Sequence, residues 1–358
     1  MSTLVFDELY PPELLTAREA KLRRFWAGNG PRAVLSVNNG VYAYRQIEDD
    51  ERTVELAAQQ ILTSATLSDD YLPWFGPDFG TISTALAWGG EVIHPDGGCV
   101  FIKPVIHSPE DVERVLATPV DPAGGHTARA IALARRVKAR LGTERIWCRA
   151  IDMQGPLSTA GLLWDQCDFI CSMITDPAAV HRVLDRVTDY LIAMYRALIA
   201  GMGPLCGMGW PYLWLPDDLG VVFTEDFAPL LSPELYKEFG IPYLKRLAEA
   251  FGGAFIHCCG SFSQHFTNLA TSGAPLLGFD YAEPDTDTLT IYEAFGPDLV
   301  YNFGLTPNGE ERWGNTANFI TQLARSAPAD MRFWFCVDTA WPDAGARIAA
   351  VREHFLCE

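Results

Sequence analysis

A histidine and a cysteine two residues apart give the clearest chemical signal in the chain. Residues 254–260, AFIHCCG, form a short apolar run that predicts a β-strand. Positions i and i+2 of a strand share a face, so His257 and Cys259 would lie side by side, with Cys258 on the other face. Zinc binds such donors, and a catalytic zinc site uses three protein ligands. Cys336 ends another apolar run and is the predicted third ligand, although a chance pair beside an inert buried cysteine would look the same.

Other polar side chains end the remaining apolar runs. We expect three carboxylates to be catalytic: Asp152, Glu225 and Asp226. We expect six further residues to bind substrate: Asn38, Gln154, Trp210, Trp214, Asp280 and Asn302. Carboxylates can move protons or hold a metal, and aromatic side chains can line an apolar pocket. The plain alternatives are solvated strand ends and an aromatic loop that only packs.

The other cysteines are expected to be reduced. The chain has nine cysteines, an odd number, in a long sequence without a secretory signal at its start, so a disulfide framework is not expected. Cys167 and Cys171 are four residues apart on a predicted helix and could imitate a metal-binding pair. We expect them instead to pack in the core.

The elements that must position these residues alternate between strands and helices. Eight strand candidates are found: 33–39, one within 70–104, 146–152, 221–227, 254–260, 276–282, 300–306 and 331–337. Alternating strands and helices favour a parallel sheet with crossover helices, and eight units predict an α/β (β/α)8 TIM barrel. A doubly wound open sheet is the alternative. No low-complexity linker divides the chain, so we expect one barrel domain over 1–358 with a helical extension over about residues 1–30.

The charge of the chain argues against some partners. With 45 acidic and 27 basic residues, its net charge is −18, which disfavours nucleic acid and anionic membranes. No apolar run approaches the roughly 20 residues of a membrane span, so we expect a cytoplasmic protein. No P-loop, dinucleotide fingerprint or Gly-x-Ser-x-Gly elbow is found. The sequence leaves the oligomeric state open, and a homodimer is one expectation.

Several motifs together resemble the uroporphyrinogen decarboxylase superfamily, which includes zinc-dependent, cobalamin-linked methyltransferases. They are RAIDMQGPLSTAGLL, TEDFAPLLSPELYKEFGIPYLKRL, HCCG, GFDYAE and VYNFGLTP, in that order. The resemblance extends from about residue 70 to the end of the chain. It implies a (β/α)8 barrel, in agreement with the strand count.

Within that superfamily the chain is more similar to the methyltransferase branch. Its first strand, SVNNGVYAYRQ, lacks the Arg-rich motif with which decarboxylases grip substrate carboxylates. His257, Cys259 and Cys336 match the branch pattern of His-x-Cys on one strand and a distant Cys on the last. The resemblance implies a Zn²⁺-dependent methyltransferase that moves a methyl group between a corrinoid (cobalamin), free or on a corrinoid protein, and a small thiol or methyl donor. A carboxy-lyase of the same fold without a metal is the alternative.

Overall fold

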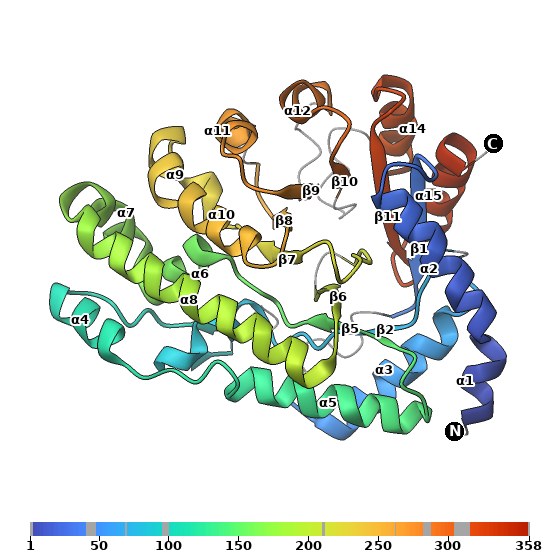
Figure 1. Ribbon diagram of the computed structural model, residues 1–358, viewed down its shortest axis with the longest axis horizontal. Helices are drawn as coiled ribbons and strands as arrows, with labels where there is room; N and C mark the ends of the chain where they lie inside the picture. The colour runs from blue at the N-terminus through green and yellow to red at the C-terminus, as the bar shows by residue number, and fades with distance from the viewer. Residues whose placement is uncertain are drawn as a thin grey trace.

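Parallel strands form the centre of the molecule (Figure 1). The computed structural model describes residues 3–40, 48–68, 70–94, 100–209, 212–261, 263–281, 288–303 and 316–356. The larger sheet has the order β1 (Ala33–Asn38), β11 (Arg332–Asp338), β10 (Val300–Phe303), β9 (Leu276–Tyr281), β8 (Ala254–Cys258) and β7 (Val221–Thr224). The smaller has the order β2 (Trp74–Phe75), β5 (Trp147–Ala150) and β6 (Leu205–Met208). All pairs in both sheets are parallel.

Helices surround these strands (Figure 1). They are α1 (Thr3–Leu9), α2 (Pro12–Trp26), α3 (Asp50–Ser64), α4 (Pro109–Ala117), α5 (Gly125–Leu141), α6 (Pro156–Leu163), α7 (Gln166–Thr175), α8 (Pro177–Met202), α9 (Pro233–Phe239), α10 (Ile241–Glu249), α11 (Phe266–Thr271), α12 (Thr288–Phe295), α14 (Thr316–Ser326) and α15 (Ala344–Val351). A short antiparallel pair, β3 (Val92–Ile93) and β4 (Phe101–Ile102), lies outside the two larger sheets. Among the described residues, no helix has both the length and the apolar character that crossing a membrane requires.

Local sequence sets where the helices begin and break. Ser108 and Ser232 cap α4 and α9, and each side chain accepts a hydrogen bond from a backbone N–H three residues on. Residues 233–249 form two helices, α9 and α10, which meet at Gly240. Pro242 lies in the first turn of α10 and has no N–H to continue the hydrogen-bond ladder of α9.

The two sheets join at the carboxyl ends of β5 and β7. Gln154 and Thr224 form a parallel bridge, and the Gly155 N–H donates to the Thr224 carbonyl at 2.7 Å. On the other side of the molecule, a side chain just before β2 links the smaller sheet to β1 of the larger sheet. The Asp70 carboxylate accepts from the Leu35 N–H at 2.8 Å. Because β1 also pairs with β11, the strands close into a barrel.

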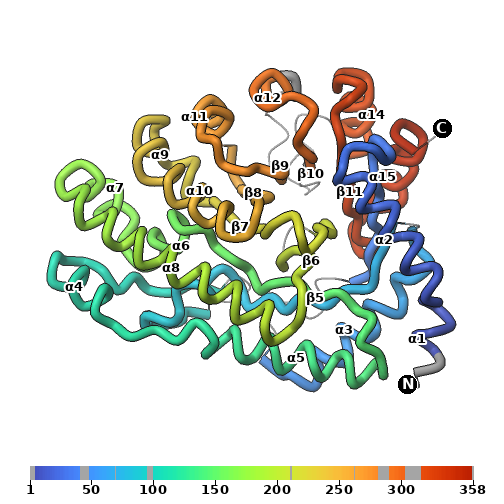
Figure 2. Tube along the Cα trace, viewed as in Figure 1, coloured from blue at the N-terminus to red at the C-terminus, as the bar shows by residue number. Residues whose placement is uncertain are grey.

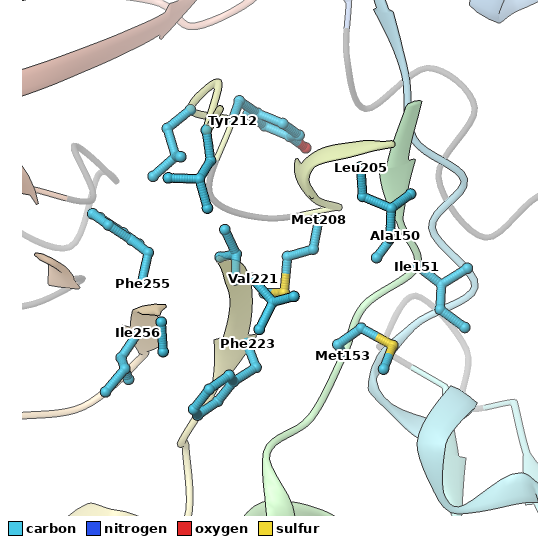
Figure 3. Packing of buried hydrophobic residues seen from close by; sticks show 14 of the residues in the cluster. Ala150, Ile151, Met153, Leu205, Met208, Tyr212, Val221, Phe223, Phe255 and Ile256 are labelled. Carbon is cyan, nitrogen blue, oxygen red and sulfur yellow. The ribbon is translucent and has the colours of Figure 1, made fainter. Parts of the chain in front are cut away.

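The predicted TIM barrel is confirmed, and the open-sheet alternative is discarded. The strand expected within 70–104 is β2, only two residues long. The sequence prediction missed β6, which pairs with β5 from Cys148↔Leu205 to Ala150↔Met208. Its segment, GPLCGM, begins with Gly-Pro and follows α8 directly, so it has the composition of a loop. Figure 3 shows Met208 and Val221 in the apolar core that this strand helps to build.

The amino-terminal helix α2 covers the amino ends of the strands. Trp26 stacks on Trp334 of β11 with ring centroids 6.3 Å apart and meets Phe255 of β8 edge-on at 6.1 Å. The Arg332 guanidinium donates to the backbone carbonyl of Phe25 at 2.8 Å. In Figure 2, α2 in blue accordingly lies beside the last elements of the chain in red. This apolar plug leaves the carboxyl ends of the strands as the end where polar chemistry can be built.

Candidate functional site

A row of polar side chains crosses the carboxyl end of the barrel, from the segment after β5 through β7, β8 and β9 to β10. The register runs continuously through Gln154, Thr224, His257, Asp280 and Asn302, each paired with the next on the neighbouring strand. Paired residues of parallel neighbours project to the same face of a sheet. All five are buried, so the row lines the inner wall of the barrel rather than its solvent surface.

His257 lies at the middle of this row and is held from both ring nitrogens. Its Nδ1 lies 2.5 Å from Oδ2 of Asp280 on β9, and its Nε2 lies 3.2 Å from Sγ of Cys259. Both the imidazole and the Asp280 carboxylate are buried. A carboxylate at Nδ1 fixes the tautomer with the proton on Nδ1, in which the Nε2 lone pair can bind a metal. Asp280 therefore orients His257, which is a different role from the substrate binding predicted for it.

Asp226 completes a cluster with the predicted pair. The ligand atoms of Asp226, His257 and Cys259 all lie within 4.8 Å of one another. Oδ1 of Asp226 accepts a hydrogen bond from the Cys259 N–H at 2.6 Å, which ties the residue after β7 to the residue after β8. Within the described residues this is the one group of three such donors close enough to hold a metal ion. These three residues are called the metal-ligand cluster below.

The electrostatics of the cluster favour a cation. Burial disfavours the protonated form of His257, but its hydrogen bonds to Asp280 and Cys259 and the charges of Asp280 and Asp226 outweigh the effect of burial. The pKa of His257 is therefore raised well above its ordinary value. In the absence of another cation, a proton on the imidazole balances the carboxylates around it.

Cys336, the predicted third ligand, lies outside this three-residue cluster. It is on β11, three strands from β8 in the sheet, where its Sγ accepts a hydrogen bond from Nδ2 of Asn38 at 3.1 Å. Burial raises the pKa of its thiol well above the ordinary value. The side chain of Asn38, predicted to bind substrate, also accepts from Nε1 of Trp74 at 3.2 Å, so both ends of its amide are engaged.

The remaining predicted polar residues divide into inner-wall groups and one outlier. Asp152 is buried at the end of β5 and accepts a hydrogen bond from Nε2 of Gln154 at 2.8 Å. Asn302 is buried at the end of the row, next to Asp280. Glu225, predicted to be catalytic, does not join them.

Glu225 is buried on the outer side of the wall, away from the metal-ligand cluster. Burial raises the pKa of Tyr236 and of Cys258, and the neighbouring Glu225 adds to both shifts. Cys258 is the cysteine on the strand face opposite His257. A side chain at Gly155 would place Cβ 1.9 Å from Oε1 of Glu225, so only glycine fits beside it. Burial, and then the charge of Asp226, raises the pKa of Glu225 well above its usual range. A carboxyl group packed behind the wall has no access to a substrate inside the barrel.

Trp214, predicted to bind substrate, lies away from the cluster of Asp226, His257 and Cys259. Trp214 packs edge-on against Trp147, the first residue of β5, and its carbonyl accepts from the Trp26 indole at 2.8 Å. These contacts place Trp214 at the amino end of the barrel, opposite the metal-ligand cluster. Trp210, the other tryptophan predicted to bind substrate, lies outside the described residues.

Cys167 and Cys171 were expected to pack in the core, and this was wrong. Both are exposed on α7. The side of α7 that packs inward carries Phe169 and Met173 instead, both buried. Two cysteines four residues apart lie on one face of a helix, but they do not show whether that face is buried or exposed.

Sequence reasoning overlooked Arg149 and Trp74. Arg149 is on β5, and its guanidinium carbon lies 3.8 Å from the centre of the Trp74 ring on β2. Arg149 is only 1% exposed. A lone arginine within the apolar run IWCRAID was the available signal, since a charge in a buried strand requires a reason.

Comparison with known proteins identifies the family. The model of the family described as uroporphyrinogen decarboxylase (URO-D) matches residues 79–296, more than half of the chain. The chain belongs to the uroporphyrinogen decarboxylase family. The matched range includes β5 to β9 and so contains the row from Gln154 to Asp280 and the cluster around His257.

Two curated relatives match shorter stretches. A uroporphyrinogen decarboxylase of Myxococcus xanthus is 28% identical over 141 residues, which is 38% of this chain and 34% of the relative. A methylated-thiol–coenzyme M methyltransferase of Methanosarcina mazei is 31% identical over 107 residues, 30% of this chain and 26% of the relative. The chain thus matches about a third or less of the length of each relative.

A solved structure matches nearly the whole fold. It is described as a methyltransferase from Methanosarcina mazei and superposes with a TM-score of 0.69 at 17% identity. The match covers 95% of this chain and 99% of the other. At this identity the likeness establishes the fold, which agrees with the closed parallel barrel.

Proposed function

We propose that this chain is a zinc-dependent methyltransferase that moves a methyl group between a corrinoid carrier and a small thiol or methyl-donor substrate. The cluster of Asp226, His257 and Cys259 at the carboxyl end of the barrel is the observation that carries the proposal. The thiol methyltransferase relative supports it. The carrier would be a corrinoid protein or free cobalamin, and we expect both to meet the chain in the cytoplasm.

The donor set fits zinc in chemical type. Zinc takes imidazole nitrogen, thiolate sulfur and carboxylate oxygen, and here one of each is provided by neighbouring strands. Behind His257, Asp280 provides the carboxylate that zinc-binding histidines commonly use at their second nitrogen. When bound, zinc would lower the pKa of a substrate thiol and hold it as the more nucleophilic thiolate.

The residues of the chain have defined tasks in such a reaction. Asp280 keeps the Nε2 lone pair of His257 directed toward Cys259. Asp226 holds the backbone at Cys259, the exposed member of the cluster, so its sulfur stays accessible at the barrel mouth. In the transfer itself the substrate sulfur bonds to the methyl carbon and the thiol proton is lost. The electron pair of the broken methyl bond remains with the donor.

The third protein ligand has two candidates. Asp226 lies in the described cluster, whereas Cys336 is the ligand that the resemblance to the methyltransferase branch implies. Asp226→Asn and Cys336→Ser, prepared in parallel, decide between them by zinc content. Loss of zinc from the Asp226 variant supports the arrangement described here, and loss from the Cys336 variant supports the predicted His257–Cys259–Cys336 set.

A metal-free carboxy-lyase is the second candidate, because the Myxococcus relative bears the name of a decarboxylase. One experiment distinguishes the two functions. Purified untagged protein is assayed for zinc, for methyl transfer from methylcobalamin to thiols, and for porphyrinogen decarboxylation. Zinc-dependent methyl transfer supports the proposal, and decarboxylation that persists without zinc would replace it.

Cys259→Ser is the matched test within this assay, with Cys167→Ser as its control. Cys167 is an exposed cysteine on α7 and is not part of the cluster of Asp226, His257 and Cys259. The Cys259 variant should lose most zinc and methyl transfer while it remains folded. The Cys167 variant should keep both.

A further inference from the structure

A buried guanidinium in the barrel wall has too few partners of its own. Arg149 is 1% exposed, and neither its Nε nor its Nη1 has a hydrogen-bond partner among the described residues. No carboxylate in the described part of the chain forms an ion pair with it. A buried charge without hydrogen bonds or a counterion is costly, so a residue of this kind requires an explanation.

Aromatic rings hold the guanidinium of Arg149 in place without neutralising its charge. The guanidinium carbon lies 3.8 Å from the Trp74 ring centre and 5.9 Å from that of Tyr212, and the two rings stack on each other. Contacts with ring faces leave the in-plane N–H groups without acceptors. The Cys206 thiol also interacts with the guanidinium but is at best a weak acceptor. Gly76 allows this close packing, because a Cβ there would lie 2.9 Å from Cβ of Arg149.

The same group is connected to the metal-ligand end of the barrel. Arg149 is one residue from the carboxyl end of β5. Its stacking partner Trp74 donates to Asn38, and Asn38 donates to Cys336. A ligand at this guanidinium would therefore lie beside residues that we expect to face the reacting group.

We propose that Arg149 binds the anionic end of a small organic acid substrate, a carboxylate or a sulfonate, while the thiol or methyl end lies toward Cys259. This inference rests on the proposed function and adds the chemical class of the substrate. A planar guanidinium matches the oxygen geometry of both acid groups, and each supplies the acceptors that Arg149 lacks. A single arginine suits one acid group.

The test compares charged and neutral ligands of similar size by calorimetry and thermal shift. The ligands are 3-mercaptopropionate, 2-mercaptoethanesulfonate and neutral 2-mercaptoethanol, with propionate and ethanesulfonate as anions without a thiol. Arg149→Met keeps an apolar side chain and removes the charge. We expect it to bind both anionic thiols at least about tenfold more weakly, the lower end of the cost of a lost charged hydrogen bond. Affinity for 2-mercaptoethanol and zinc content should not change.

Arg347→Met is the matched control. Arg347 is also 1% exposed, but it pairs with Asp343 at 2.7 Å and stacks on Trp341. Its loss should lower the melting temperature and leave anion binding intact. Arg149→Met should melt at the wild-type temperature or above, because it removes a buried charge without a partner. If it does not fold, Arg149→Lys decides, with weaker anion binding expected because the planar fork is lost.

The outcomes separate this inference from the proposed function. Equal anion affinity in wild type and Arg149→Met, or equal affinity of wild type for charged and neutral thiols, overturns the role of Arg149. Methyl transfer to neutral thiols at undiminished kcat/KM would keep the methyltransferase and remove the acid specificity. Arg149-dependent binding of propionate or ethanesulfonate without zinc or methyl transfer would keep the anion site and remove the methyltransferase. The relative response to the carboxylate and the sulfonate identifies which acid group the site prefers.

Discussion

Replacing Asp280 by Asn should weaken metal binding while leaving the barrel intact. Asp280 reaches His257 Nδ1 at 2.5 Å, and both side chains are buried. Asn has almost the same volume, so packing is preserved. The charge is lost, and the amide can present its NH₂ group to Nδ1, which would favour the tautomer with the proton on Nε2. That tautomer cannot bind a metal through Nε2.

The expected magnitude follows from this geometry. Carboxylates that support a metal-binding histidine are typically worth about 10- to 100-fold in metal affinity. That range corresponds to about 1.4–2.7 kcal/mol. We expect the upper part of it here, because the contact is buried and charged, and water cannot replace the lost carboxylate.

The assay is a competition titration of zinc against a chelating dye. Asp168→Asn, on the exposed surface of α7, is the control for the same chemical change and should match the wild type. Circular dichroism checks the fold of both variants. A zinc affinity of Asp280→Asn within about twofold of the wild type would refute the carboxylate–histidine argument.

The same contact predicts a pH dependence in the metal-free protein. The pKa of His257 is raised in the folded state, so its proton stabilises the fold fully below the unfolded value of about 6.5. That stabilisation is lost as the pH rises through the folded pKa. Denaturant titrations of metal-free protein from mildly acidic to alkaline pH should show it, and Asp280→Asn should show less of it. An equal loss of stability with rising pH in the wild type and in Asp280→Asn would contradict the role given to the His257–Asp280 contact.

Three further outcomes are expected. Glu225→Gln should equal or exceed wild-type stability at pH 8 with unchanged zinc content. The raised pKa of Glu225 makes the folded wild type lose stability as the pH rises from the unfolded pKa of this carboxyl toward its folded pKa. Melting curves at pH 5 and 8 test this, and lower stability of the variant at pH 8 would contradict it. Trp214→Ala should cost about 3–5 kcal/mol in urea unfolding without loss of zinc, since Trp214 packs at the amino end of the barrel. Removal of zinc with a chelator should leave the circular dichroism spectrum unchanged, and unfolding on chelation would show that the metal is structural.

The fold was largely predictable because strand and helix periodicities are local. The alternation of apolar runs and amphipathic helices identified the barrel, and helices α1 and α2 lie within the region expected to be helical, about residues 1–30. What failed was short or punctuated structure. Strand β6 has four residues next to Gly and Pro, and its pairing with β5 is a long-range contact that no local pattern encodes.

The candidate site was predictable in its central pair and not in its surroundings. His257 and Cys259 follow from the two-residue period of a strand, which applies within one element. Whether Asp226 or Cys336 lies near them depends on strand order and barrel stagger. Adjacent residues at a strand end face opposite sides, so Asp226 meets the cluster and Glu225 does not. The sequence alone leaves open which of the two faces inward.

The most direct measurement is anomalous X-ray scattering from crystals of the untagged protein at the zinc absorption edge. The account predicts one strong peak per chain, within bonding distance of Nε2 of His257 and Sγ of Cys259, about 2.0–2.3 Å. The peak should be absent from Cys259→Ser crystals grown under the same conditions. No peak near His257 in the wild type, or an undiminished peak in Cys259→Ser, would contradict it.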